Sequence, residues 1–135
     1  MTTRAWFLVF LFAATATTAS AREVSLINLI ATPTAFHAKP VVILGFLHSE
    51  REGDAVYLHR DDWEQGIAKN GLWIDVDSIP VERLKELNNR YVLVEGTFDM
   101  VNQGHLGSWS GSIHRITRIE ALRPLPSQQA PGRVN

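Results

Sequence analysis

Apolar residues along the chain occur in short runs whose spacing predicts a domain built mainly from strands. Residues Val41–His48 (VVILGFLH) are apolar at nearly every position, which is typical of a strand buried on both faces. Gly45 in the middle of this run indicates a tight bend, as in a small barrel. Polar residues 50–54 follow as a turn, and Ala55–His59 (AVYLH) predicts the returning strand.

Two further segments have the spacing of strands. In Leu72–Val76 (LWIDV) apolar side chains alternate with Trp73 and Asp75, which predicts a half-buried strand. Tyr91–Phe98 (YVLVEGTF) predicts a longer strand, with Gly96 at a second bend. The inward positions of that strand are expected to belong to the core.

Helical spacing occurs in two places. Within Asp77–Asn89 an apolar stripe predicts a helix between the third and fourth strands, formed by Val81, Leu84 and Leu87. Near the start of the chain, Ser25 is a suitable N-cap for a short helix. The apolar face of that helix would consist of Leu26, Leu29 and Ile30.

The last element, Ser112–Leu122, has an ambiguous pattern. Its isoleucines recur every third position, which fits either a bulged strand or a short helix. The abundance of Ile, Thr and Ser favours a strand with a bulge near His114–Arg115, because an extra residue would reset the alternation.

The resulting order is strand, strand, strand, helix, strand, strand. This is the order of the OB-fold, a five-stranded partly open barrel, so we expect a mainly β, OB-fold-like domain with a short N-terminal helix. The chain also resembles a family of small exported bacterial proteins that is uncharacterised in activity. The resemblance is carried by VVILGFLH, YLHRDDWEQGIAKNGLWID, NRYVLVEGTF and GHLGSWSGSI. It implies the fold and export, and it transfers no active site.

Residues 1–21 have the layout of a secretory signal peptide. Arg4 precedes the apolar run Ala5–Ala14, and Ala19-Ser20-Ala21 offers small residues for cleavage, with Ala16 as the alternative cleavage position. The expected organisation is a signal peptide over residues 1–21, an OB-like domain over 22–122 and a disordered tail over 123–135. The tail is rich in proline and poor in large apolar residues. The protein is therefore expected to be exported, to the periplasm or the medium.

Composition narrows the expected partners. The chain has 13 Lys and Arg and 14 Asp and Glu, and without Arg4 its net charge is near −2. Clustered basic charge of the kind that binds phosphate backbones is missing from the sequence, which predicts no nucleic-acid partner. The chain has no cysteine and hence no disulfide, and no second long apolar run predicts a membrane span after signal cleavage.

Two groups of polar residues raise the question of chemistry. Imidazole and carboxylate side chains could bind zinc or copper through His59, Asp61, Asp62 and His105. The same carboxylates with Glu64 could act as a pair in hydrolysis of a sugar. Neither set has a specific spacing, and the alternative is a solvated turn with His59 at a strand end. No cofactor and no catalytic residue are predicted.

Aromatic side chains suggest binding instead. The glycine-rich loop Asn102–Ser112 lies between the last two strands, where OB-folds hold ligands. Its aromatic groups and those near the preceding strands could form a platform made of Tyr57, Trp63, Trp73, His105 and Trp109. The alternative is that they only pack under the loops and close the barrel. The sequence therefore predicts a non-enzymatic binding module for a protein, peptide or glycan, with a metal-binding or hydrolytic envelope protein as the alternative.

Overall fold

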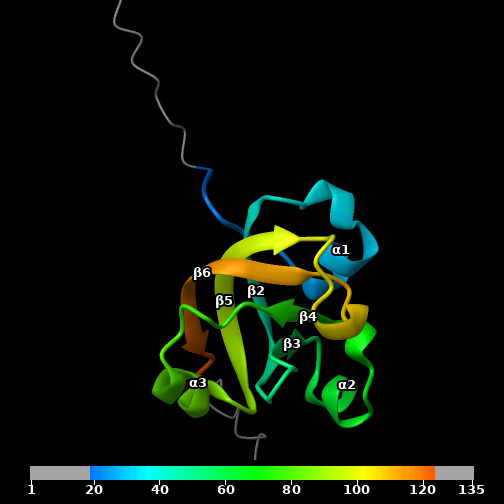
Figure 1. The fold of residues 1–135 in the computed structure, drawn as a ribbon. Helices are drawn as coiled ribbons and strands as arrows, with labels where there is room; N and C mark the ends of the chain where they lie inside the picture. The colour runs from blue at the N-terminus through cyan, green and yellow to red at the C-terminus, as the bar shows by residue number, and fades with distance from the viewer. Residues whose placement is uncertain (1–18, 124–135) are drawn as a thin grey trace, which may run out of the picture.

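The computed structural model describes residues 19–123 and shows a closed five-stranded β-barrel with short helices on its outside (Figure 1). The predicted signal peptide and the predicted disordered tail fall mainly on residues 1–18 and 124–135, which lie outside the described residues. The barrel strands are β2 (Pro40–His48), β3 (Ala55–Tyr57), β4 (Gly71–Ile74), β5 (Arg90–Asp99) and β6 (Ser112–Ala121). The helices are α1 (Leu26–Ala31), α2 (Arg60–Glu64) and α3 (Val81–Leu87), and β1 is Arg22–Glu23. The 3-10 turns are η1 (Pro33–Ala35), η2 (Ala68–Asn70) and η3 (His105–Gly107).

The strands pair in the order β2-β3-β4-β6-β5, and β5 returns to β2. Neighbouring strands are antiparallel except β4 and β6, which are parallel. With α3 between β4 and β5, this confirms the predicted order and the OB-like fold. The prediction of a partly open barrel is corrected in one respect, because the β2–β5 and β4–β6 pairings close it.

The interior of the barrel is a single apolar cluster. Strand alternation directs one side chain in two inward, and Val92, Val94 and Phe98 of β5 are fully buried as predicted. Leu26 and Leu29 of α1 and Leu87 of α3 belong to the same cluster. The predicted stripe on α3 is only partly correct, since Val81 is 65% exposed.

Close strand contacts explain both glycines predicted at bends. A Cβ at Gly45 would lie 2.5 Å from the Val56 side chain and 2.6 Å from the Tyr57 carbonyl oxygen. A Cβ at Gly96 would lie 2.6 Å from the Ile113 side chain. Larger residues at either position would therefore force the strands apart.

The predicted bulge in the last strand is confirmed. Glu95 pairs with Arg118 and Thr97 with His114, so three residues of β6 face one residue of β5. Arg115 within this segment has a φ of 50°. The extra residues explain why the isoleucine spacing did not match a regular strand.

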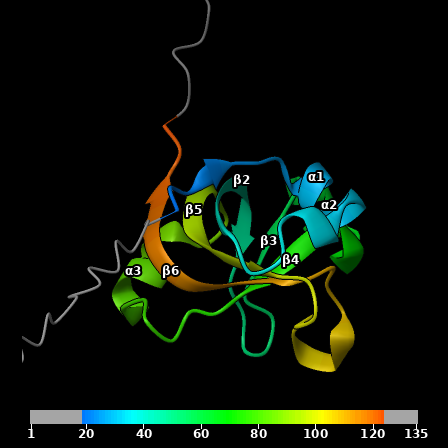
Figure 2. The ribbon, with the colours of Figure 1, turned by 90° about the horizontal axis from the view of Figure 1, so that it is seen from above.

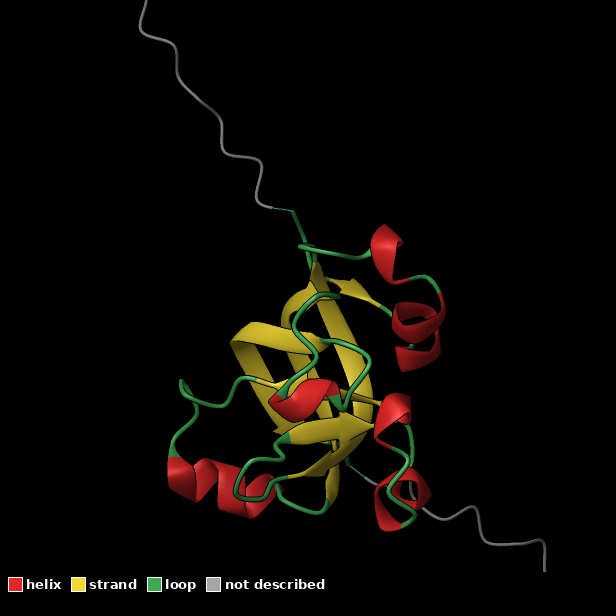
Figure 3. Ribbon diagram, turned by 45° about the vertical axis from the view of Figure 1, so that its right-hand side comes forward, coloured by secondary structure: helices red, strands yellow, loops and turns green. Residues whose placement is uncertain are grey.

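Short elements before and between the strands cover the ends of the barrel (Figure 3). Ser25 caps α1 by accepting a hydrogen bond from the Ile27 N–H at 3.2 Å, as the sequence predicted. Two elements were not expected: β1, which pairs in parallel with β2, and α2, which replaces the predicted polar turn. Among the described residues, no helix is long and apolar enough to span a membrane.

Candidate ligand groove between two loops

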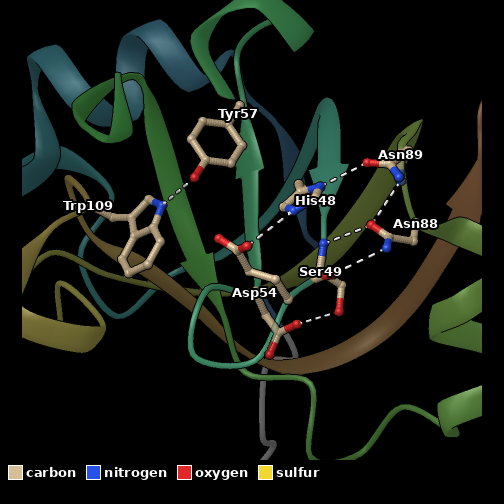
Figure 4. A network of polar contacts seen from close by, with 8 residues as sticks. His48, Ser49, Asp54, Tyr57, Asn88, Asn89 and Trp109 are labelled. Carbon is tan, nitrogen blue, oxygen red and sulfur yellow. Dashed lines mark hydrogen bonds and ion pairs between the residues drawn. The ribbon is translucent and has the colours of Figure 1, made fainter. Parts of the chain in front are cut away.

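An aromatic cluster lies on the outside of the barrel, against β3 and β4. Ala55, Tyr57 and Trp109 are its buried members, and the partly buried Trp63, Ala68 and Trp73 pack against them. The indole N–H of Trp109 donates a hydrogen bond to the Tyr57 hydroxyl at 3.3 Å (Figure 4). The outer face of β3 and β4 is therefore covered by the protein's own side chains along most of its length.

The cover is supplied by the β5–β6 loop, residues 100–111, which stands out beside the barrel in Figure 2. Lys69 holds the loop by donating from its ammonium group to the carbonyl oxygens of Gly107 at 2.9 Å and Trp109 at 2.8 Å. The Ser110 hydroxyl donates to the Lys69 carbonyl at 2.6 Å. The loop and η2 therefore donate hydrogen bonds to each other, which holds the loop in place.

Gly104 lets this loop approach the barrel. Its φ is +69°, and a Cβ there would lie 2.7 Å from side-chain atoms of both Trp109 and Trp73. A side chain at this position would enter the space between the two indoles and meet backbone strain as well. The loop therefore passes directly over Trp73.

A groove remains open where the β5–β6 loop faces the β2–β3 loop, residues 49–54. It holds a cavity of about 430 Å³ lined by Glu52, Asp54, Trp73, Asn102, Gly104 and His105. A second cavity of about 330 Å³ shares two of these residues and is lined by Glu50, Arg51, Glu52 and His105. We call the two together the Trp73 groove. Its floor is an indole from β4, and its walls are the two loops.

One close polar contact connects the walls of the Trp73 groove. His105 Nε2 lies 3.8 Å from a carboxylate oxygen of Glu52, and both side chains are more than half exposed. On the β2–β3 side, the Asp54 carboxylate accepts a hydrogen bond from the Ser49 hydroxyl at 2.5 Å. The groove thus contains polar groups at its rim and an apolar ring at its floor, the usual composition of a recognition site.

The base of the β2–β3 loop is held by a polar network (Figure 4). The Asn88 side chain accepts from the Ser49 N–H at 2.8 Å and donates to the Ser49 carbonyl at 3.1 Å. His48 Nδ1 lies 2.8 Å from the Asn89 side-chain oxygen, and the His48 ring stacks on Trp63 with centroids 4.0 Å apart. These contacts connect the end of β2 to the start of β5.

Two titratable groups near the groove have shifted pKa values. Burial raises the pKa of Tyr57, the hydrogen bond from Trp109 opposes this, and the charge of Glu50 raises the pKa further. The pKa of Asp99, the last residue of β5, is lowered mainly because its carboxylate accepts the Val101 N–H. The negative charge of Glu50 therefore acts on the aromatic cluster, and a charged Asp99 stabilises the start of the loop.

The residues of the predicted aromatic platform have different positions in the structure. Trp73 and His105 line the groove, whereas Tyr57 and Trp109 are each only 6% exposed and act in packing. Trp63 packs on Phe46 and His48. The sequence analysis did not identify the groove carboxylates Glu50, Glu52 and Asp54. The available signal was three carboxylates within five residues of one predicted turn.

Of the predicted metal and hydrolytic residues, His59 and Asp62 take part in hydrogen bonds at the start of α2. His59 precedes α2, and its N–H donates to the Asp62 carboxylate at 2.9 Å, which also accepts from the Asn70 side chain at 2.8 Å. Asp62 is only 8% exposed, so its interpretation as part of a solvated turn is corrected. Within residues 19–123, no three His, Asp or Glu side chains gather in an arrangement that would hold a metal, and His105 lies in the groove instead.

The chain was compared with family models, curated proteins and solved structures. No family model matches the chain. No curated protein matches it. Among solved structures, a protein named "putative aspartyl-tRNA synthetase" from Leishmania major Friedlin is similar over 84% of this chain and 24% of its own, with 16% sequence identity and a TM-score of 0.43. The chain therefore spans about a quarter of that protein.

This similarity corrects the prediction about partners. The exclusion of nucleic acid is withdrawn, because a chain with a similar course belongs to an enzyme named for tRNA. At this identity and TM-score the similarity assigns no ligand to the present protein. The mainly β, OB-like barrel rests on the strand pairings of this chain alone.

Proposed function

We propose that this protein is an exported binding module that holds its ligand in the Trp73 groove. The observation that carries the proposal is an aromatic floor between two loops that the fold itself holds in place. The backbone of Trp73 pairs with Ala55 of β3 and with Ser112 of β6. Gly104 of the β5–β6 loop lies close to the Trp73 side chain. An indole that is partly exposed and held in one position offers a large contact area at little entropic cost.

The groups around Trp73 support recognition rather than proton transfer. The Glu50 and Glu52 side chains are 63% and 73% exposed, so both carboxylates remain in water. Groups that exchange protons with a substrate are commonly tuned by burial or by close charged neighbours. Exposed carboxylates are suited to attract and orient a ligand instead.

Export is supported by the signal-like pattern of residues 1–21. In the described part of the chain, Ala19 and Ser20 are exposed and Arg22 begins β1. Cleavage after Ala21 would therefore leave β1 complete. The periplasm and the medium both fit this reading.

NMR titration of the purified protein tests the proposal. Short peptides, oligosaccharides and oligonucleotides are added in turn, and the indole N–H signals of Trp63, Trp73 and Trp109 are followed. We expect a binding ligand to shift the Trp73 signal most. Trp73→Ala should weaken its binding about tenfold, as expected for loss of one stacking aromatic.

Val81→Ala is the matched control, because Val81 is 65% exposed and lies on α3, away from the β5–β6 loop in Figures 1 and 2. This variant should bind as the unchanged protein does. A ligand whose binding shifts signals of α3 and leaves Trp73 unchanged would contradict the proposal, as would a panel in which nothing binds.

A further inference from the structure

The two walls of the Trp73 groove carry unequal charge. The β2–β3 loop contributes three carboxylates, Glu50, Glu52 and Asp54. Arg51 is the one arginine or lysine that lines the groove, and His105 pairs with Glu52. Three carboxylates against one guanidinium leave two negative charges around the indole when His105 is neutral.

The aromatic floor acts in the same direction as the carboxylates. The face of an indole ring carries negative electrostatic potential, and tryptophan is the best aromatic partner for a cation. The Trp73 indole lines the groove together with the Glu52 and Asp54 carboxylates of the β2–β3 loop. A positively charged group over Trp73 would interact favourably with both.

Among the residues that the structure describes, no lysine lines the two cavities of the groove, so none neutralises it directly. Lys69 is engaged within the β5–β6 loop, where its ammonium group donates to the carbonyls of Gly107 and Trp109. The field of the acidic loop also reaches the aromatic cluster, since the charge of Glu50 is one of the causes that raise the pKa of Tyr57. The negative charge of the rim is thus available to a ligand.

We infer that the ligand of the Trp73 groove is a peptide segment bearing a lysine or arginine side chain, with its cationic end over Trp73 and beside Glu52 and Asp54. This inference rests on the proposed function and adds the chemical class of the ligand. The charge complementarity selects the occupant, and the aliphatic stem of such a side chain can cover the indole while its end reaches the carboxylates.

Four ligands of equal length test the inference on the full protein. They are a peptide with one central lysine, the same peptide with that lysine acetylated, the same peptide with glutamate in its place, and a single-stranded oligonucleotide. The lysine peptide should bind at Trp73 and weaken as salt is raised from 50 to 300 mM, because exposed charges are screened. Acetylation should weaken binding at least fivefold, since it removes the charge and retains most of the side chain.

Glu52→Gln should weaken binding of the lysine peptide about three- to fivefold and reduce its salt dependence, the range expected for an exposed charge pair. Glu82→Gln is the matched control, because Glu82 is an exposed carboxylate on α3 and the substitution changes the net charge equally. It should leave the affinity unchanged. Melting temperatures of both variants show whether each is folded.

The outcomes separate this inference from the proposed function. If the acetylated, glutamate or oligonucleotide ligand shifts the Trp73 signal at lower concentration than the lysine peptide does, the cationic class is wrong while the groove remains the binding site. If the lysine peptide binds equally well to Glu52→Gln and to the unchanged protein, the inference also fails. If no ligand affects Trp73, both are overturned.

Discussion

The Trp109 indole N–H and the Tyr57 hydroxyl meet at 3.3 Å across 52 positions of the chain, and this contact joins the β5–β6 loop to the outer face of β3. In an OB-like barrel with an exposed face, a ligand could lie along these strands. Here the buried indole of Trp109 occupies that place. The Trp73 end of this face lines the groove.

Trp109→Ala is expected to lower the free energy of unfolding by about 3–5 kcal/mol, because a buried indole is lost and a cavity remains. Tyr57→Phe keeps the ring and removes only the hydroxyl, so its effect should be about 1 kcal/mol. Urea denaturation measures both. A loss below about 1 kcal/mol for Trp109→Ala would mean that the loop does not depend on this side chain.

Asp62→Ala should lower the free energy of unfolding by about 1–3 kcal/mol, because the His59 N–H and the Asn70 amide lose a buried acceptor. Asp61→Ala, at an exposed position of the same helix, should change it by about 0.5 kcal/mol or less. Adding zinc or copper should leave the melting temperature of the unchanged protein constant. Stoichiometric metal in the purified protein would support the metal-binding alternative.

The lowered pKa of Asp99 predicts a pH dependence of stability. The folded protein binds this proton less tightly than the unfolded chain, so the contribution of Asp99 to stability is complete above its ordinary pKa of 3.8 and is lost as the pH falls through the lower folded value. Asp99→Asn should therefore be less stable than the unchanged protein at pH 7, and the difference should shrink toward pH 2. A difference that stays constant over this range would show that the charge of Asp99 has no role.

Mass spectrometry of the native protein should find Arg22 at the N-terminus if residues 1–21 are a cleaved signal peptide. Replacing Ala19 and Ala21 with larger residues should block cleavage at this position, because the site requires small side chains. The matched control is the same replacement at Ala31 on the exposed end of α1, which should leave processing unchanged. Recovery of intact chains from a membrane fraction would identify the segment as an anchor.

The fold could be predicted from the sequence wherever the core imposed a regular spacing. The alternation in Leu72–Val76 and the apolar run of Val41–His48 fixed two barrel strands, and the irregular isoleucines of β6 indicated its bulge. The two-residue β1 has no such pattern, because its pairing depends on a tertiary neighbour. Helix α2 was not predicted because its residues are almost all polar and show no apolar stripe. Its capping acceptor, Asp62, is buried, which the sequence pattern does not indicate.

The candidate site was less predictable than the fold. Alternation correctly directed Trp73 away from the barrel interior, but it could not show that Trp109 would be buried over the same strands. The acidic β2–β3 loop was interpreted only as a turn. Glu52 becomes part of a groove because the folded β5–β6 loop places His105 3.8 Å from it. Such a site depends on the folding of two distant loops toward each other, which local patterns do not encode.

The network around His48, Ser49, Asn88 and Asn89 has a consequence for the thermodynamics of binding. It orders the base of the β2–β3 loop in the free protein, whereas the exposed Glu52 lies beyond it. A ligand in the groove would then lose little affinity to ordering of the backbone and would mainly restrict a few side chains at the tip. Binding should accordingly carry a small conformational entropy penalty, set by the tip of the loop alone.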